Sequence, residues 1–409
     1  MMEKADFYAD TRTDLKGPLD GIRVLEATTS WAGPMVGCLL GDYGADVIKV
    51  ESPDGEVMRL LTPHLDGPGK LPLMNEMVNR NKQNLSLNIN SEEGRKIFIK
   101  LALSCDIVVE NFRPGTLHAW GLGYEHLREA KHDIIYVSVS GFGQYGPHHD
   151  QAAYDPLAQA FTGWMSLNGE VDGPPVKAPT FLADDLAGLH GALAALAALH
   201  HRDQTGEGQH IDACMVDSVL AFSNILPSSA LLGLPVEKQG NEFPTAAPLN
   251  TFECRNGWIY LAVMLDSHWS KFCEAMQNPE LAEDERFTTI NARLAHRQEV
   301  NQLVSDWCRQ QDQAGAIELM AEAGIPVSPV NDFEAAARSK HVSEREMIQE
   351  IELSDGSKAP LTSPVANFSR TPVTIRTPAQ PIGAQNGEIL SELGISEKEQ
   401  EQLREKGII

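Results

Sequence analysis

The sequence has no pair of cysteines at the close spacing that zinc sites use. Its six cysteines are scattered between Cys38 and Cys308 without a C-x-x-C pattern, so neither a metal site nor a disulfide framework is indicated. Unclustered cysteines of this kind are typical of a reducing compartment. We therefore expect a cytoplasmic protein with no bound metal.

Long basic runs and long apolar runs are also missing. The net charge is −24, and no Lys/Arg run could follow a phosphate backbone, which argues against nucleic acid and an anionic membrane as main partners. No apolar run is long and continuous enough to predict a membrane span, and the N-terminus lacks the pattern of a signal peptide. An anionic ligand must therefore be held by local contacts.

A dinucleotide fingerprint is absent, although the first elements are typical of a nucleotide-binding fold. Residues 21–27 and 45–51 predict two strands, and 33–43 predict the helix between them. Together they form a βαβ unit, which implies a parallel sheet. The turn at 28–34 is not G-x-G-x-x-G, which counts against a dehydrogenase.

Two later strands each end in a loop rich in glycine and proline. The predicted strand 106–110 runs into 111–115, and the predicted strand 133–140 runs into 141–147. In open α/β sheets, ligands bind at the carboxyl edge of the strands. The sequence thus predicts a binding site formed by these loops.

The chain is too long for one hydrophobic core, because single cores stop growing at about 250–300 residues. We expect an α/β fold in which a larger and a smaller domain alternate along the 409 residues. The predicted parts are an N-terminal arm at 1–18, a large α/β domain at 19–224, a small α+β domain with its linkers at 225–328, and a C-terminal return to the large domain at 329–409.

The stretch 180–208 is the centre of this arrangement. Leucines recur at helical spacing from Leu186 to Leu199, with mostly alanine and glycine between them, which predicts a buried helix packed closely by its neighbours. Asp184 and Asp185 stand where the helix should begin, beside unpaired N–H groups and the positive end of the helix dipole. Each carboxylate is either a helix cap or a reagent.

Several short motifs, in order along most of the chain, together resemble the family III CoA-transferases. They are 19–26 (LDGIRVLE), 32–34 (AGP), 44–51 (GADVIKVE), 111–115 (NFRPG), 141–143 (GFG), 183–188 (ADDLAG) and 205–209 (TGEGQ). Each motif alone is weak, whereas seven in register are specific.

The resemblance implies a fold and an activity. The fold would be a Rossmann-like parallel-sheet domain with a smaller α+β domain, in an interlocked homodimer. The activity would be transfer of coenzyme A from an acyl-CoA to a free carboxylic acid, with CoA as co-substrate and no permanently bound cofactor. The same family leaves two alternatives open, an acyl-CoA racemase or isomerase, and a non-catalytic CoA-binding subunit that pairs with a paralogue.

The resemblance also indicates the nucleophile. The family's catalytic aspartate lies four residues before a glycine, which selects Asp184 before Gly188, whereas a spacing of three would select Asp185. We interpret Asp185 as a helix cap or as a partner of the helix dipole. A carboxylate can attack a thioester and carry CoA as an aspartyl thioester between two mixed anhydrides, which needs neither a metal nor a redox cofactor.

Positions that match the family's CoA contacts are expected to bind CoA. They are Lys82, Asn111, Phe112 and Arg113, to which we add Arg59 and Arg80 because Ser52 and Ser140 stand where some transferases have basic residues. Positions expected to contact the acid are Trp31, Gly141, Phe142, Gly143, Tyr154, Gly240, Thr245 and Ala246. Tyr154 stands where racemases carry their acid/base histidine, which favours transfer over racemisation. Trp31 replaces a glutamine of formyl-CoA transferases, which indicates a larger or partly apolar acid.

Overall fold

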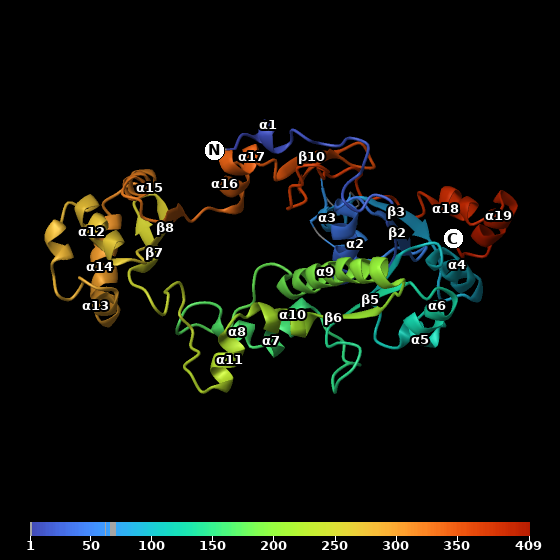
Figure 1. Ribbon diagram of the computed structural model, residues 1–409, viewed down its shortest axis with the longest axis horizontal. Coiled ribbons are helices and arrows are strands. Elements are labelled where there is room, and N and C mark those ends of the chain that lie inside the picture. Colours follow the sequence, from blue (N-terminus) through green and yellow to red (C-terminus); the bar gives the residue numbers. More distant parts are fainter. Residues whose placement is uncertain (1, 62, 66–70) are drawn as a thin grey trace. The chain divides into compact units, whose positions relative to one another are not determined.

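The computed structural model describes residues 2–61, 63–65 and 71–409, which form two compact units (Figure 1). The first unit takes in the described residues up to 165, together with 177–233 and 344–409. The second unit takes in 166–176 and 234–343.

The second unit differs in extent from the expected range 225–328. Residues 225–233 remain with the first unit and include the helix α11 (Leu226–Leu231), where a linker was expected. The added segment 166–176 is tied to the second unit by Lys238, whose Nζ donates to the carbonyls of Gly173 and Pro174 at 2.8 Å each. This contact joins residues far apart in the sequence, so local patterns did not indicate it.

Six parallel strands form the sheet of the first unit, in the order β3-β2-β1-β4-β5-β6. The strands are β1 (Arg23–Ala27), β2 (Asp46–Glu51), β3 (Lys82–Ser86), β4 (Ile107–Glu110), β5 (Ile135–Ser140) and β6 (His210–Cys214). This order places a topological switch point between β1 and β4, as in doubly wound dinucleotide-binding folds. The predicted α/β class with a parallel sheet is confirmed, while β3 was not predicted.

Helices cover both faces of this sheet, because alternate side chains of each strand point to opposite faces. Val24 belongs to the core shared with α2 (Ala32–Asp42), α9 (Leu182–Thr205) and α10 (Met215–Phe222). Leu25 belongs to the opposite core, shared with α4 (Glu92–Ala102) and α18 (Asn386–Glu392). The shorter helices outside the second unit's main segment are α1 (Lys4–Phe7), η1 (Val57–Arg59), α3 (Leu73–Asn79), α5 (Thr116–Ala119), α6 (Tyr124–Ala130), α7 (Asp155–Phe161), α8 (Trp164–Leu167) and α19 (Glu397–Glu405).

The central helix α9 lies against α2 with almost no space between the two backbones. A Cβ atom on Gly188 would be 2.6 Å from Cβ of Met35, and one on Gly191 would be 2.9 Å from Cγ2 of Val36. Real Cβ contacts are longer than this, so glycine is required at both positions. The space beside Gly188 is filled by α2 and is not open to a substrate.

By length and composition α9 is long and apolar enough to cross a membrane, which differs from the expectation drawn from the sequence. Half of its most apolar window is buried. Figure 1 shows α9 beside α10 and the strands β5 and β6, with which it packs. These contacts are those of a core helix in a folded domain.

The second unit is built on a small antiparallel sheet in the order β7-β8-β9, formed by β7 (Leu249–Cys254), β8 (Gly257–Ala262) and β9 (Val327–Pro329). Strands β7 and β8 form a hairpin in which Cys254 pairs with Gly257, so the turn consists of Arg255 and Asn256. The helices that follow are α12 (Asp266–Ala275), η2 (Pro279–Ala282), α13 (Ile290–Ala295), α14 (Arg297–Cys308), α15 (Gln313–Glu322), α16 (Phe333–Ala337) and α17 (Lys340–Glu344).

Residues 344–409 belong to the first unit and begin with the antiparallel strands β10 (Ile348–Glu352) and β11 (Lys358–Thr362). The side chain of Gln385 accepts a hydrogen bond from the backbone N–H of Asn84 at 2.7 Å, and that of Asn386 accepts one from Ser86 at 2.8 Å. The C-terminal segment thereby occupies donors at the free edge of β3, which would otherwise be open to pairing with another strand.

Candidate active site

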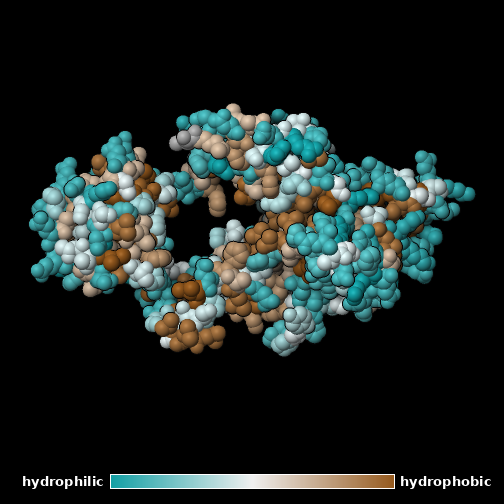
Figure 2. Space-filling model, in the orientation of Figure 1, coloured by the Kyte–Doolittle hydropathy of each residue, from teal (hydrophilic) through white to brown (hydrophobic). Residues whose placement is uncertain are grey.

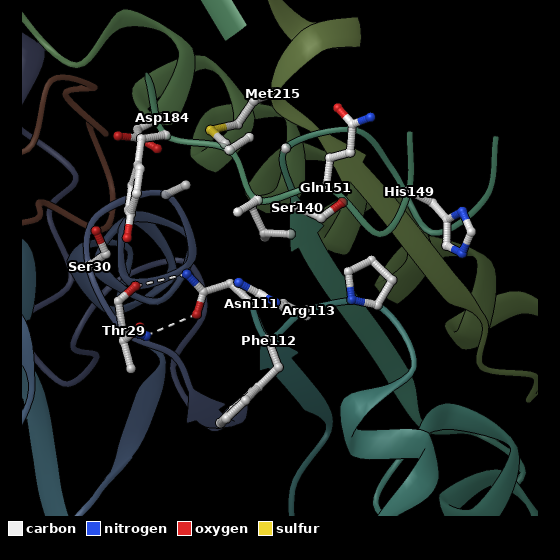
Figure 3. Close-up of a pocket in the computed structure, with 17 residues that line it drawn as sticks. Thr29, Ser30, Asn111, Phe112, Arg113, Ser140, His149, Gln151, Asp184 and Met215 are labelled. Atoms are coloured by element: carbon white, nitrogen blue, oxygen red, sulfur yellow. Dashed lines mark hydrogen bonds between the residues drawn. The ribbon is translucent and has the colours of Figure 1, made fainter. Parts of the chain in front are cut away.

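A cavity of about 230 Å³ opens at the carboxyl ends of β1, β4 and β5, around the switch point of the sheet (Figure 3). Its lining residues come from loops that are distant in sequence. They are Thr29, Ser30 and Ala32 after β1, Asn111, Phe112, Arg113 and Pro114 after β4, Val139, Ser140 and Gly141 at the end of β5, the loop residues His149, Gln151, Ala152, Ala153 and Tyr154, and Asp184 and Met215.

Asp184 lies in the first turn of α9 and is the one carboxylate of the described lining. Among the described residues its side chain has no hydrogen-bond or ion-pair partner. Burial raises the pKa of Asp184 to about 7, and the nearby charges of Asp155 and Asp185 act in the same direction. The carboxylate therefore has the exposure to the cavity and the basicity that a nucleophile needs.

The carboxylates next to Asp184 are both held in place. The Oδ1 atom of Asp185 accepts a hydrogen bond from the indole N–H of Trp31 at 2.7 Å. Asp155 on α7 accepts one from the backbone N–H of Ala183 at 2.6 Å and another from Gln159 at 2.6 Å. Asp185 therefore does not cap α9, because Asp155 binds an N-terminal N–H of this helix and Asp185 binds Trp31. Its place in the first turn agrees with the alternative role, a partner of the helix dipole.

Asn111 connects the loops on the two sides of the switch point. Its Oδ1 accepts from the N–H of Thr29 at 2.9 Å, and its Nδ2 donates to the carbonyl of Thr29 at 2.8 Å (Figure 3). The next residue, Phe112, donates its N–H to Glu110 at 2.8 Å. The loop that carries Asn111, Phe112 and Arg113 is thereby fixed at the cavity, where the sequence analysis expected it.

Arg113 is the one Lys or Arg of the described lining. Its guanidinium has no hydrogen-bond or ion-pair partner among the described residues. In a chain with a net charge of −24, such a cation at a cavity is a local place for an anion to bind.

The other cations expected to bind CoA lie elsewhere, with their charges taken up by carboxylates. Lys82 is buried, with its Nζ 2.8 Å from Oε2 of Glu26. Arg80 pairs with Asp42 at 2.7 Å, and Arg59 binds both oxygens of Glu51. These positions do not support a contact of Lys82, Arg80 or Arg59 with CoA, since binding a phosphate would break a shielded ion pair.

The glycine motif after β5 reaches the cavity through its first residue. A Cβ on Gly141 would lie 2.1 Å from Cβ of Ala153, so the close contact of these two loops requires glycine. Gly143 and Phe142 do not line the cavity. The N–H of Gly143 donates to Oγ of Ser140 at 3.0 Å, and Phe142 packs on Phe161 with ring centroids 5.3 Å apart.

Three residues expected to contact the acid lie in the second unit. Gly240 has a φ of 57°, a left-handed conformation that glycine adopts most easily. Ala246 is buried and pairs with Phe243, and Thr245 lies between them and is exposed. They stay expected contacts, described within their own unit.

Sequence reasoning missed His149, Gln151 and Ser30 as lining residues. His149 follows the glycine and proline loop after β5, and its Nδ1 lies 2.8 Å from the carbonyl oxygen of Gly146. That loop was expected at the site, but nothing in its pattern distinguished His149 from its neighbour. His190, further along α9, hydrogen bonds to Ser218 at 3.0 Å and is not a lining residue.

A second cavity, of about 140 Å³, lies at the carboxyl ends of β1 and β2 and the loop after β3. Its lining is mixed: Thr28, Ser52 and Asn88 lie beside apolar residues such as Val50, Leu87 and Ile89. Thr29 and Phe112 line both cavities. A ligand that extends from one cavity to the other would therefore pass these two residues.

The chain matches the family described as CoA-transferase family III over residues 19–386. The beta subunit of succinyl-CoA–L-malate CoA-transferase from Chloroflexus aurantiacus is 36% identical over 402 residues, covering 96% of this chain and 98% of that protein. The succinyl-CoA:mesaconate CoA-transferase of Haloarcula hispanica is 36% identical over 343 residues, covering 82% and 86% of the two chains.

The fold agrees with these sequence relatives. The crystal structure of a CaiB/BaiF family protein from Brucella suis has a TM-score of 0.83 and 33% identity, and the match covers 92% of this chain and 100% of that one. The six-stranded sheet, the fixed loops around Asp184 and the match along almost the whole chain agree with one another. The chain therefore belongs to the family III CoA-transferases.

Proposed function

We propose that this CoA-transferase uses Asp184 as the nucleophile that carries CoA between two carboxylic acids. The observation that supports this most directly is the position of Asp184, which faces the cavity without a partner while Asp155 and Asp185 are both held by hydrogen bonds. A nucleophile must be free to reach a substrate carbonyl, and Asp184 is the carboxylate that meets this condition.

The proposed reaction begins when an oxygen of Asp184 attacks the thioester carbonyl carbon. The C–S bond breaks, the thiolate of CoA leaves with the electron pair, and a mixed anhydride remains. The thiolate then attacks the aspartyl carbonyl carbon, which releases the first acid as a carboxylate and leaves an aspartyl-CoA thioester. The carboxylate of the second acid then attacks the aspartyl carbonyl carbon, which releases the thiolate of CoA and leaves a second mixed anhydride. The thiolate attacks the carbonyl carbon of the second acid in this anhydride. The new acyl-CoA leaves, and the carboxylate of Asp184 is regenerated.

We propose that CoA extends across both cavities. Its nucleotide would occupy the cavity lined by Thr28, Ser52 and Asn88, because ligands of open α/β sheets bind at this edge, and its thioester would reach Asp184. Phe112 lies where the two cavities meet. Arg113 would bind an anionic group of this substrate.

For the acids, we propose succinyl-CoA as donor and a dicarboxylic acid of similar size as acceptor. Two relatives of about one-third identity are named for succinyl-CoA with malate or mesaconate. The unpartnered guanidinium of Arg113 and the amide of Gln151 are suited to a second carboxylate. Trp31, next to the lining residue Ser30, would contact the acid, and in place of a glutamine it favours a larger or partly apolar one.

The test is to trap the covalent intermediate and to screen the acids. The enzyme is incubated with succinyl-CoA and then with hydroxylamine or borohydride, and peptide mass spectrometry locates the modified residue. We expect modification of Asp184 alone, and modification of Asp185 or of no residue would contradict the mechanism.

A panel of malate, mesaconate, glutarate, acetate and oxalate, with mass detection of each new thioester, identifies the acceptor.

A racemase or isomerase remains a second candidate because His149 lines the same cavity as Asp184. A histidine and a carboxylate on opposite sides of an α-carbon could exchange its proton. Incubation of a 2-methylacyl-CoA in deuterated water, without a free acid, separates the two functions. Transferase chemistry predicts no deuterium at the α-carbon, and exchange without transfer would favour the racemase.

We propose that the chain acts as a dimer. Exposed leucines lie on α9, at Leu189 and Leu193, and at the end of α11, where Leu231 and the capping residue Leu232 are 90% and 76% exposed. Figure 2 shows hydrophobic side chains gathered over these helices. An apolar surface of this kind is typical of a protein interface, and the family resemblance indicates an interlocked homodimer.

A paralogue is the other partner to consider, since one relative is named a beta subunit. Native mass measurement of the purified chain is expected to give twice the mass of the 409-residue protein. An inactive monomer that gains activity on addition of a paralogue would instead support the non-catalytic subunit. For location, we propose the cytoplasm, because all six cysteines are free and buried.

A further inference from the structure

The turn between β1 and α2 is held by contacts with several different elements of the first unit. Thr28 binds Glu26 and Lys49, Thr29 binds Asn111, Ser30 donates its N–H to Glu56, and Trp31 binds Asp185. Ser30 has a φ of 66°, a left-handed conformation that is rare for this residue type. The contacts on both sides keep it there, so the turn presents Trp31 in one orientation.

Trp31 in turn fixes Asp185. The indole N–H donates to Oδ1 of Asp185 at 2.7 Å, and the indole ring packs on Phe181 with centroids 5.2 Å apart. Asp185 would have to break this hydrogen bond to reach the cavity. The two adjacent aspartates therefore differ, since one carboxylate is anchored and the other is free.

An anchored carboxylate beside a reacting one has an electrostatic effect on the reaction. As a free carboxylate Asp184 is negatively charged, and it is repelled by the charges of Asp155 and Asp185. When Asp184 attacks a thioester, its oxygen forms a bond to the acyl carbon and the negative charge leaves with the thiolate of CoA. The acylated side chain is neutral, so each covalent intermediate is free of this repulsion.

We propose that Asp185, oriented by Trp31, is a positioning residue of the transfer reaction: its fixed negative charge destabilises the free carboxylate of Asp184 relative to the acylated side chain. This inference rests on the proposed role of Asp184 as nucleophile. It assigns to Asp185 a role that is neither helix capping nor nucleophilic attack.

Other ionisable groups face Asp184 and must be considered with Asp185. The cavity adds Arg113, His149 and Tyr154, and α7 adds Asp155. The helices α2 and α10, which also pack on α9, carry Cys38, Asp42 and Asp217, and none of these three contributes to the raised pKa of Asp184. Asp155 and Asp185 are the charges that act on Asp184 most directly.

The experiment separates the charge of Asp185 from its hydrogen bond. Asp185→Asn removes the charge but keeps an oxygen that can accept from Trp31, whereas Trp31→Phe removes the hydrogen bond and leaves the charge. Asp203→Asn, the same substitution at an exposed position in the last turns of α9, is the matched control. For each variant, kcat and KM are measured across pH, and the aspartyl-CoA thioester is trapped with borohydride.

We expect the acid limb of kcat/KM for Asp185→Asn to move down by about one pH unit, because one nearby negative charge has been removed. The trapped thioester at pH 8 should fall roughly tenfold, the population change that corresponds to one unit. Trp31→Phe should keep the acid limb and lower kcat at saturating concentrations of both substrates, a readout that a change in acid binding does not move. Asp203→Asn should behave as the parent.

An unchanged acid limb and unchanged thioester in Asp185→Asn would overturn the role of the charge, and an unchanged kcat in Trp31→Phe would overturn the role of the orientation. If Asp185→Asn fails to fold by circular dichroism, Asp185→Glu supplies the test, since it keeps the charge and must keep the parent's acid limb. Full activity of Asp184→Asn would instead refute the proposed function, so the two failures are distinguishable.

Discussion

Charged groups are paired in one half of the six-stranded sheet and unpaired in the other. On and beside β1, β2 and β3, Lys82 and Lys49 pair with Glu26, and Arg59 pairs with Glu51. At the ends of β4 and β5 and the start of α9, Arg113 and Asp184 have no partner among the described residues. Paired buried charges hold a structure together, whereas unpaired charges at a cavity are available to a substrate.

The difference implies that substitutions in the two regions should damage different properties. Loss of a paired charge leaves its partner buried and uncompensated, which costs stability. Loss of an unpaired charge removes no contact of the folded protein, so it should lower the reaction rate or the affinity for substrate while stability is kept.

Asp184→Asn should reduce transfer by at least about a thousandfold, because the amide cannot act as the nucleophile. The fold should be retained, and the variant should be more stable than the parent at pH 8. Burial raises the pKa of Asp184 to about 7, so the ionised carboxylate is unfavourable in the folded state, and the amide avoids this cost. Steady-state kinetics and thermal unfolding provide the two measurements. If Asp184→Asn lost stability together with activity, this result would contradict the distinction between the two regions.

Lys82→Met should lower the free energy of unfolding by about 3–5 kcal/mol, because Glu26 loses one of its buried partners. The matched control is Lys96→Met, which breaks an exposed ion pair with Glu92 and should leave stability unchanged. Denaturant titration measures both. If Lys82→Met is as stable as the parent but binds acyl-CoA poorly, Lys82 contacts the ligand after all.

Arg113→Gln should raise KM for succinyl-CoA by about 30-fold, which is ~2 kcal/mol, through the loss of a charge-assisted contact. Arg338→Gln, which removes a surface arginine paired with Glu334, should leave KM unchanged. Comparison with acetyl-CoA identifies the bound group. An equal loss for both thioesters indicates a phosphate of CoA, a loss for succinyl-CoA alone indicates its second carboxylate, and no loss for either would show that Arg113 binds neither.

Glu110→Gln should change how stability depends on pH, by about 1–3 kcal/mol. Burial raises the pKa of Glu110 to about 7, with hydrogen bonds from Ser138 and the N–H of Phe112 opposing the shift. A raised pKa means that the contribution of Glu110 to stability is complete below about pH 4.5 and is lost as the pH rises through 7. Between pH 5 and 8 the free energy of unfolding should therefore change less with pH in the variant than in the parent. An identical pH dependence would contradict the raised pKa of Glu110.

The fold was predictable from the sequence because its signals are local. The strands that became β1, β2, β4 and β5 carry apolar runs bounded by turn residues, and the spacing of small residues and leucines identified α9. The strand β3 was missed because its sequence, KQNLS, is mostly polar. Its polar side chains are satisfied by distant groups, Glu26 for Lys82 and Glu51 for Asn84, which no local pattern can indicate.

The site was predictable where a motif fixes the backbone and unpredictable where a side chain has a choice of partner. The loop with Asn111 and Arg113 lies where the family resemblance indicated. Lys82 carries the positive charge that could bind a phosphate. Its Nζ instead forms an ion pair with Glu26, which lies 56 residues earlier in the chain. His149 reaches the cavity because of the course of an irregular loop, which depends on tertiary packing.

The glycine contacts between α2 and α9 have a consequence for how such an enzyme can acquire new substrates. Gly188 and Gly191 place the backbone of α9 directly against Met35 and Val36, so α9 has no room to shift. A change in the accepted acid must then come from residues that can vary while Asp184 stays where it is. The loop at 149–154, whose side chains line the cavity from an irregular segment, is where we expect the range of acids to be altered by selection or by design.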